Sequence, residues 1–161
     1  SFECVHNLQY WKMKDYLGIG AGAHSRVTDK EGVRWAFRTH RAPNKWLSET
    51  KIYGHAITEK ICLSLEDQIF ETLMMGLRLK TGVSTADFKN TFKKSIEEIF
   101  TGDTLKILLD EQLVELDNES FRATSLGRQK LDSLIQFLFS DFDSNHNPTF
   151  FEETQLTNEE I

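Results

Sequence analysis

The sequence has few cysteines and no long apolar run, and each scarcity excludes a class of protein. Cys4 and Cys62 lie far apart and form no CxxC pattern, which favours free thiols in a reducing cytoplasm over a disulfide framework. No apolar stretch approaches the ~18 residues that cross a bilayer, so no transmembrane segment is predicted. An initiator Met and a basic start followed by an apolar run are also absent. We therefore expect a fragment of a longer protein.

The 161 residues fit one domain, or one small domain plus part of another, and their charge is unevenly distributed. Residues 1–60 contain ten Lys/Arg and six Asp/Glu, a net charge of +4, whereas residues 61–161 contain nine and nineteen, a net charge of −10. The first part is expected to attract an anion such as a carboxylate, and the second to repel nucleic acid. Two ordinary solvated surfaces explain the same numbers.

The first part of the chain predicts a strand, a β-hairpin and a helix. Residues 15–23 form a short apolar run that ends in glycines and predict a strand. Residues 26–40 alternate polar and apolar side chains on both sides of the turn 29–32, which predicts a β-hairpin. Pro43 at a first helical position predicts a helix over 43–55 that ends near Gly54. The residues expected to face inward from this helix are Trp46, Leu47 and Tyr53.

From residue 63 the apolar period changes to that of helices. Three helices are predicted over 64–81, 84–100 and 103–111, the first ending where Gly82 takes the left-handed conformation. Residues 113–123 predict a second hairpin with its turn at 117–120, followed by one long helix over 125–139. The remaining residues, 141–161, are polar, acidic and without period, and predict a flexible tail in which Phe150 and Phe151 are a candidate docking point.

Candidate ligand-binding residues are concentrated between residues 6 and 25. An imidazole, an amide and two aromatic faces occur within six residues, and three glycines at alternate positions then precede a second histidine. Glycines allow backbone to approach a ligand closely, although Gly-x-Gly-x-Gly without a following helix is not a dinucleotide fingerprint. The first group comprises His6, Asn7, Tyr10 and Trp11, and the second comprises Gly18, Gly20, Gly22, Ala23, His24 and Ser25.

Two strings in this sequence resemble one family. The first is Cys4 and HNxxYW at 6–11, followed by DYLGIGAGAHS at 15–25, and the second is ExxMMGLRLxxGV at 71–83. Both are similar to the oxygen-independent coproporphyrinogen III oxidase-like radical SAM proteins (HemN/HemW), and the HNxxYW form is similar to the HemW branch of haem chaperones. The motif residues of the second string are Glu71, Gly76, Arg78 and Gly82.

The resemblance implies an α+β fold. It comprises the terminal elements of a partial (β/α) barrel over 1–60, a small helical winged-helix-like C-terminal domain over 61–140, and the tail. It implies a parent protein with a [4Fe-4S] cluster, S-adenosyl-L-methionine (SAM) and haem or porphyrin. Its partners would be its own N-terminal radical SAM barrel and a haem-receiving protein. No CxxxCxxC cluster loop occurs in this chain, so we expect no SAM cleavage by the chain alone.

Site roles follow from the same resemblance. His6 is expected to contact haem iron, with Asn7, Tyr10 and Trp11 beside the macrocycle, and residues 18–25 are expected to lie near SAM or substrate. A hydrogen-bonded structural corner is the alternative for the His-Asn pair, and the role of His24 is left open. An apolar residue occupies the His24 position in the oxidase branch, which favours haem delivery over the oxidase reaction.

Three other interpretations of the sequence remain open. Arg34, Arg38, Arg41 and Lys45 are either a clamp for propionates or the solvated side of a hairpin. Glu71 and Arg78, seven residues apart on the predicted helix, are interpreted as a structural tie between domains. A winged-helix DNA-binding module over 63–140 is a further alternative, but its reading helix near 104–111 has one Lys and two acids and offers little to phosphates.

Overall fold

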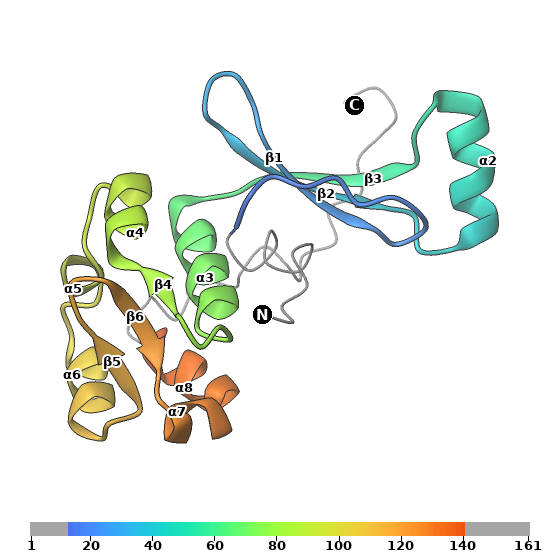
Figure 1. The fold of residues 1–161 in the computed structure, drawn as a ribbon. Coiled ribbons are helices and arrows are strands. Elements are labelled where there is room, and N and C mark those ends of the chain that lie inside the picture. Colours follow the sequence, from blue (N-terminus) through green and yellow to red (C-terminus); the bar gives the residue numbers. More distant parts are fainter. Residues whose placement is uncertain (1–12, 141–161) are drawn as a thin grey trace. The chain divides into compact units, whose positions relative to one another are not determined.

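The computed structural model describes residues 13–140, and these separate into two compact units. Residues 14–64 form one unit and residues 65–140 lie in the other. Each unit contains its own three-stranded antiparallel sheet (Figure 1). None of the helices in the described range is long and apolar enough to cross a membrane.

The unit 14–64 is a sheet with one helical connection. Its strands β1 (His24–Thr28), β2 (Arg34–Thr39) and β3 (Ile57–Cys62) pair antiparallel in that order. Helix α2 (Pro43–Tyr53) connects β2 to β3 at one end of the sheet (Figure 1). The predicted hairpin and helix are thereby confirmed, whereas β3 was not predicted.

The β1–β2 turn is held by one carboxylate. Asp29 Oδ1 accepts hydrogen bonds from the backbone N–H groups of Val33 (2.8 Å) and Glu31 (3.1 Å). Asp29 Oδ2 accepts a bond from Trp35 Nε1 at 2.8 Å. The Trp35 bond, followed by the backbone bonds, lowers the pKa of Asp29 because each favours the charged carboxylate.

Helix α2 has the predicted ends but not the predicted packing. Pro43 is at its start, and Gly54 (φ +81°) ends it in the left-handed conformation, donating its N–H to the Thr50 carbonyl. The prediction that Leu47 and Tyr53 face inward is wrong, because they are 47% and 52% exposed and none of the α2 residues is buried.

The strand predicted over 15–23 is also wrong. Only Tyr16 forms a bridge, to Arg26 of β1, with backbone hydrogen bonds of 2.8 and 3.0 Å. Beyond it the strand pairing does not continue, and the apolar Leu17 and Ile19 are 74% and 93% exposed. Glycines have little strand propensity, which explains why the apolar run does not continue the pairing.

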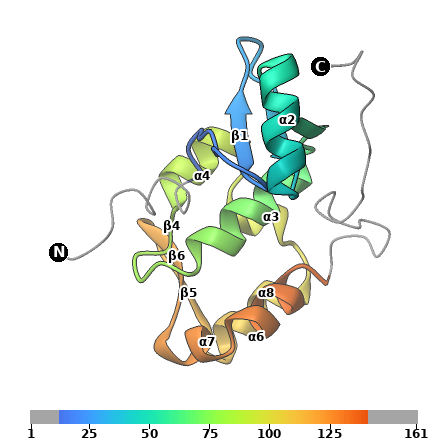
Figure 2. The same ribbon diagram turned by 90° about the vertical axis from the view of Figure 1, so that its right-hand side faces the viewer.

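The unit 65–140 is mainly helical around a small sheet. Its strands pair in the order β4-β6-β5, so the β5–β6 hairpin extends the short strand that follows the first helix (Figures 1 and 2). The elements in chain order are α3 (Leu65–Gly76), β4 (Val83–Ser84), α4 (Thr85–Phe92), α5 (Ile96–Ile99), α6 (Asp103–Asp110), β5 (Val114–Leu116), β6 (Ser120–Ala123), α7 (Ser125–Gln129) and α8 (Leu131–Leu138).

One apolar core holds this unit together. It draws on α3, α4, α5, α6, α8 and all three strands, and its centre includes Leu73, Leu77, Phe88, Leu108 and Phe121, each 2% exposed or less. Full burial of side chains of this size contributes about 1.5–3 kcal/mol each before entropy is counted. Phe139 places its ring edge against Phe70 and Phe100 at centroid distances of 4.8 and 5.4 Å.

Three predicted helix boundaries are wrong in this unit. Helix α3 ends at Gly76 rather than near 81, and the segment predicted over 84–100 is two helices separated at Lys93, whose φ is +59°. The helix predicted over 125–139 divides at Lys130 (φ −121°) into α7 and α8. Helix α6 and the β5–β6 hairpin match their predictions. Residues 141–161 lie outside the described range, so the flexible tail remains a prediction.

Candidate functional site

The glycine segment 18–22 is tied to the first sheet by hydrogen bonds. The Gly18 N–H donates to Ser25 Oγ at 3.0 Å. The Thr39 hydroxyl donates to the Gly20 carbonyl at 2.6 Å and accepts from the Ala23 N–H at 2.9 Å. The Gly22 N–H donates to the His40 carbonyl at 2.7 Å. Strands β1 and β2 therefore fix this segment at the sheet edge, as a loop.

Gly18 is the position where close approach to β1 requires glycine. A Cβ placed there would lie 2.2 Å from the His24 carbonyl oxygen, far inside van der Waals contact. Gly20 and Gly22 instead have φ values of +112° and +71°, which side-chain-bearing residues rarely adopt. Glycine is therefore required at these positions for two different reasons, which are close packing at Gly18 and positive φ at Gly20 and Gly22.

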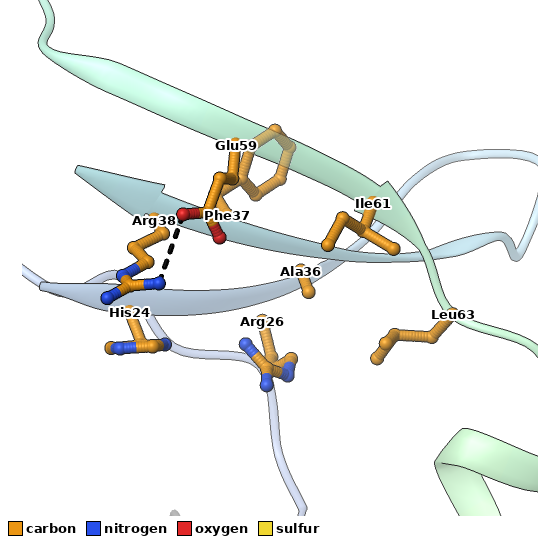
Figure 3. Close-up of a pocket in the computed structure, with 8 residues that line it drawn as sticks. All are labelled: His24, Arg26, Ala36, Phe37, Arg38, Glu59, Ile61 and Leu63. Atoms are coloured by element: carbon orange, nitrogen blue, oxygen red, sulfur yellow. Dashed lines mark hydrogen bonds and ion pairs between the residues drawn. The ribbon is translucent and has the colours of Figure 1, made fainter. Parts of the chain in front are cut away.

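A small open pocket lies on one face of this sheet (Figure 3). In the strand register His24 is opposite Arg38, and Arg38 is opposite Glu59. The next cross-strand row contains Arg26, Ala36 and Ile61. Directly opposed residues point to the same face, so a small Ala36 between larger neighbours leaves the pocket open. Its lining is His24, Arg26, Ala36, Phe37, Arg38, Glu59, Ile61 and Leu63.

The charged groups of the pocket differ in exposure. Arg38 Nη1 pairs with Glu59 Oε1 at 3.0 Å, with side chains 12% and 20% exposed. Arg26 is 4% exposed, and its Nη1 donates to the Ser25 carbonyl at 2.9 Å. Figure 3 shows His24 and Arg26 projecting side by side from β1. The pocket therefore combines the Arg38–Glu59 ion pair and the buried Arg26 with apolar Ile61 and Leu63.

His24 is the exposed member of this set, and its pKa is lowered. Desolvation lowers its pKa most, and the positive charges of Arg38 and Arg26 lower it further against a smaller opposing effect of Glu59. Among the described residues, no hydrogen-bond partner is found for its ring. By contrast, His40 Nε2 pairs with Glu49 at 2.9 Å, and His55 Nδ1 accepts the Ile57 N–H at 3.4 Å.

The predicted site residues are only partly within the described range. His6, Asn7, Tyr10 and Trp11 lie outside it, so their roles remain predictions. Gly18, Gly20, Gly22, Ala23, His24 and Ser25 lie together beside β1 and β2. No group of three or more His, Cys, Asp or Glu side chains suited to a metal ion occurs between residues 13 and 140.

The residues of the second motif lie within the unit 65–140. Glu71 is buried in α3. Gly76 packs so closely on β4 that an added Cβ would lie 2.1 Å from Val83 Cγ2, and Gly82 has a φ of +69°. Gly82 precedes β4 instead of ending α3, which corrects its predicted capping role.

Arg78 follows α3 and is not on its face. It donates to the Met74 carbonyl and lies 3.6 Å from Asp132 of α8. The prediction that Glu71 and Arg78 lie on one helix is wrong, because α3 ends at Gly76. Their role as a structural tie between domains stays a prediction.

Three of the four basic residues considered as a propionate clamp form ion pairs with different acidic side chains. Arg34 pairs with Asp15 at 3.2 Å, Arg38 with Glu59 at 3.0 Å, and Lys45 with Glu49 at 3.8 Å. Of the four, only Arg38 lines the pocket. Arg26, Glu59 and Ile61 were missed as pocket residues. The alternation of Thr58 and Lys60 with Ile57, Glu59 and Ile61 is the strand signal that would have found the last two.

Comparison with known proteins places both units in one family. Residues 63–129 match the HemN C-terminal domain. The chain is 31% identical to heme chaperone HemW of Lactococcus lactis over 88% of its own length and 36% of that protein. It is also 31% identical to heme chaperone HemW of Buchnera aphidicola (subspecies Acyrthosiphon pisum), over 84% of the chain and 34% of that protein. The bovine mitochondrial radical S-adenosyl methionine domain-containing protein 1 is 30% identical over 84% of the chain and 32% of that protein.

A solved structure shares the fold. Coproporphyrinogen III oxidase (HemN) from Escherichia coli, a radical SAM enzyme, matches 79% of this chain and 29% of its own with a TM-score of 0.58 and 18% identity. The chain spans about a third of the length of these relatives. The matches agree with both sequence motifs, and the chain belongs to the HemN/HemW family of radical SAM proteins, whose C-terminal domain it contains.

Proposed function

We propose that this chain is the C-terminal portion of a haem-binding protein that delivers haem. The observation that carries the proposal is the extent of similarity to proteins named heme chaperone. An alignment covering 88% of 161 residues is longer than the 99 residues from 63 to 161, so it includes most of the first 62. The similarity therefore extends through the sheet that bears the pocket.

The proposed parent combines three parts. Residues 1–60 would complete a partial (β/α) barrel, residues 61–140 would be a winged-helix-like domain, and residues 141–161 a tail. The strand order β4-β6-β5 with helices on both sides of β4 supports the second assignment. The parent would hold a [4Fe-4S] cluster and SAM in its N-terminal barrel, as radical SAM relatives do. A cytoplasmic location is proposed because the sequence has only two cysteines, which lie far apart and form no CxxC pattern.

Two groups of residues receive roles in this proposal. His6 would contact haem iron, with Asn7, Tyr10 and Trp11 along the macrocycle. The segment 18–25 would provide backbone contacts near SAM or substrate, since glycines leave its N–H groups approachable. The pocket face supports a partly apolar ligand, because Ile61 and Leu63 lie in its lining beside the Arg38–Glu59 pair.

Haemin titration of the purified full chain tests the proposal. The wild-type chain is expected to give a saturable Soret band at one haemin per chain, and His6→Ala to weaken binding by about tenfold or more, as loss of a ligand does. His55→Ala is the matched control, because it removes an imidazole that bonds only to the Ile57 N–H among the described residues. Absence of saturable binding by the wild-type chain would refute haem binding.

The oxidase alternative rests on the fold alone, because the match to the Escherichia coli oxidase is only 18% identical. Anaerobic incubation of the cluster-reconstituted parent with coproporphyrinogen III and SAM distinguishes the two functions. Haem delivery predicts no protoporphyrinogen above the SAM-free control. Product formation that depends on SAM would assign the parent to the oxidases.

A further inference from the structure

The exposed apolar side chains of the unit 14–64 lie at one end of its sheet. The start of β1, the end of β2 and the start of β3 meet at this end, since His24, Arg38 and Glu59 are opposite one another. Residues 16–23 lead into β1 there, and residues 40–56, which include α2, connect β2 to β3 there (Figure 1). These two segments are termed the α2 end. All five exposed large apolar side chains of the unit belong to it, namely Leu17, Ile19, Leu47, Ile52 and Tyr53.

The α2 end is exposed despite its apolar side chains. None of the α2 residues is buried, and Ile52 is 71% exposed. The loop that carries Ile19 is held on the sheet, because the Gly18 N–H donates to Ser25 Oγ at 3.0 Å and the Gly20 carbonyl accepts from the Thr39 hydroxyl at 2.6 Å. Single exposed aliphatic side chains are ordinary on a protein surface, but five at one end of a small unit indicate an interaction surface.

The α2 end is also basic. Residues 40–56 contain three Lys/Arg and one Asp/Glu, and the other segment of this end contains neither. The single acid, Glu49, is bound to His40 at 2.9 Å. Arg41 and Lys51 are exposed and have no acidic partner among the described residues. An occupant of this surface is therefore expected to combine apolar side chains with negative charge.

The last residues of the chain have this complementary composition. Residues 141–161 contain six Asp/Glu and no Lys or Arg, and the sequence FFEE occupies positions 150–153. Its aromatic rings provide apolar contact area, and its carboxylates favour a basic surface. The unit 65–140 matches this segment less well, because it contains thirteen Asp/Glu and nine Lys/Arg.

The length of the segment allows it to reach the α2 end. Residues 141–161 are 21 residues, which span at most about 70 Å when extended. A folded unit the size of 65–140 has a diameter of about 30 Å. An attached segment meets a surface of its own chain at an effective concentration of about millimolar, an advantage that a second copy in dilute solution lacks.

We propose that residues 141–161 dock on the α2 end of the same chain. The FFEE sequence lies on the exposed apolar side chains of this end, and its carboxylates lie toward Arg41 and Lys51. The inference goes beyond the proposed function and is independent of it, because it involves no contact with haem.

Amide and methyl NMR spectra of the full chain test the docking. One variant combines Phe150→Ala with Phe151→Ala, and Phe142→Ala is the matched control from the same segment. Docking predicts that the paired substitutions move the resonances of the five exposed apolar residues of the α2 end, by at least about twice the effect of Phe142→Ala. The resonances of Ile107 and Leu126, exposed apolar residues of the unit 65–140, should stay in place.

Concentration and salt distinguish the occupants. The wild-type resonances of the α2 end should not change on tenfold dilution, because the contact is intramolecular. Raising salt from about 50 to 500 mM should move them toward those of the paired variant, since screening weakens the ionic part of the contact. Resonances that move on dilution would assign the surface to a second copy and overturn the docking. Equal spectra of the α2 end in wild type and the paired variant, or changes at Ile107 and Leu126 instead, would also overturn it.

Discussion

At the scale of single residues, Thr39 is the hydroxyl that holds the glycine segment on the sheet. It lies on β2, donates to the Gly20 carbonyl at 2.6 Å and accepts the Ala23 N–H at 2.9 Å. No other described side chain bonds the segment at two points. Because three glycines give that segment high conformational entropy when free, the two bonds contribute to its order together with the Gly18 and Gly22 backbone bonds.

Thr39→Val keeps the shape of the side chain and removes both bonds. Each lost bond costs about 0.5–1.5 kcal/mol, so the local opening free energy should fall by about 1–3 kcal/mol. Hydrogen exchange at the Ala23 amide should accelerate about 5–150-fold. Thr50→Val is the control, since it removes a similar bond to the Trp46 carbonyl within α2. Equal Ala23 exchange in wild type and Thr39→Val would contradict this role.

The residues of the site show which of its parts could be predicted from the sequence. The three glycines and His24 were predicted because glycine and histidine have special backbone and chemical properties and occur here within a short stretch. The pocket around His24 was not, since Arg26, Ala36 and Glu59 become neighbours only through the register of three strands. Register depends on pairing partners distant in sequence, and one of those partners, β3, was not predicted.

At the scale of elements, the start of α4 depends on one side chain. Ser84 has an extended backbone (φ −63°, ψ 122°), and its hydroxyl accepts the Asp87 N–H at 3.2 Å. Ser84→Ala should destabilise the unit 65–140 by about 0.5–2 kcal/mol, while Ser84→Gly should cost only a few tenths. Urea unfolding followed by helical circular dichroism measures both. An alanine variant as stable as wild type would indicate that the side chain caps nothing.

The β5–β6 turn predicts an acid dependence with a defined sign. Asp117 accepts the N–H groups of Ser120 and Glu119, each at 2.8 Å, and pairs with Arg122 at 2.8 Å. These bonds, Ser120 first, lower the pKa of Asp117 below its ordinary 3.8. Since the folded pKa is depressed, the stabilisation is complete above the unfolded value and is lost as pH falls through the folded one.

Carbon-13 shifts of the Asp117 carboxyl should therefore titrate with a midpoint below 3.8. Protection of the Ser120 amide, corrected for intrinsic exchange, should decrease over the same pH range. Asp117→Asn removes the ionisation, so its Ser120 protection should not vary across that range. A midpoint at or above 3.8, or an equal pH dependence in the variant, would disprove this account of the turn.

Helices and strands were predicted correctly where local sequence signals were strong. Their predicted boundaries were wrong where tertiary packing determines the ends of the elements. Pro43, Gly54 and Ser84 marked real helix ends because capping is local chemistry. The divisions at Lys93 and Lys130 carry no Gly or Pro signal, and they occur where successive apolar residues must turn to reach one core. The apolar stripe was recovered, since Phe88, Phe92, Ile96 and Phe100 are all buried.

At the scale of the whole molecule, the two units differ in how much apolar surface they bury. Every residue of the principal core lies between residues 69 and 138. In the unit 14–64 the buried apolar residues are Ala56 and Leu63 alone, and the sheet residues of β2 are only half-buried. Because burial is the dominant favourable contribution to folding, stability should be concentrated in the helical unit.

A fragment of residues 63–140 should therefore fold alone, whereas residues 14–64 alone should not. The first is expected to show a cooperative thermal transition and a dispersed amide spectrum, because it retains the complete core from Ile69 to Leu138. The second lacks a comparable core to offset its backbone entropy and should give a collapsed spectrum. Differential scanning calorimetry and amide NMR spectra of both fragments test this prediction. A cooperative transition in 14–64, or its absence in 63–140, would show that the observed burial does not set where stability lies.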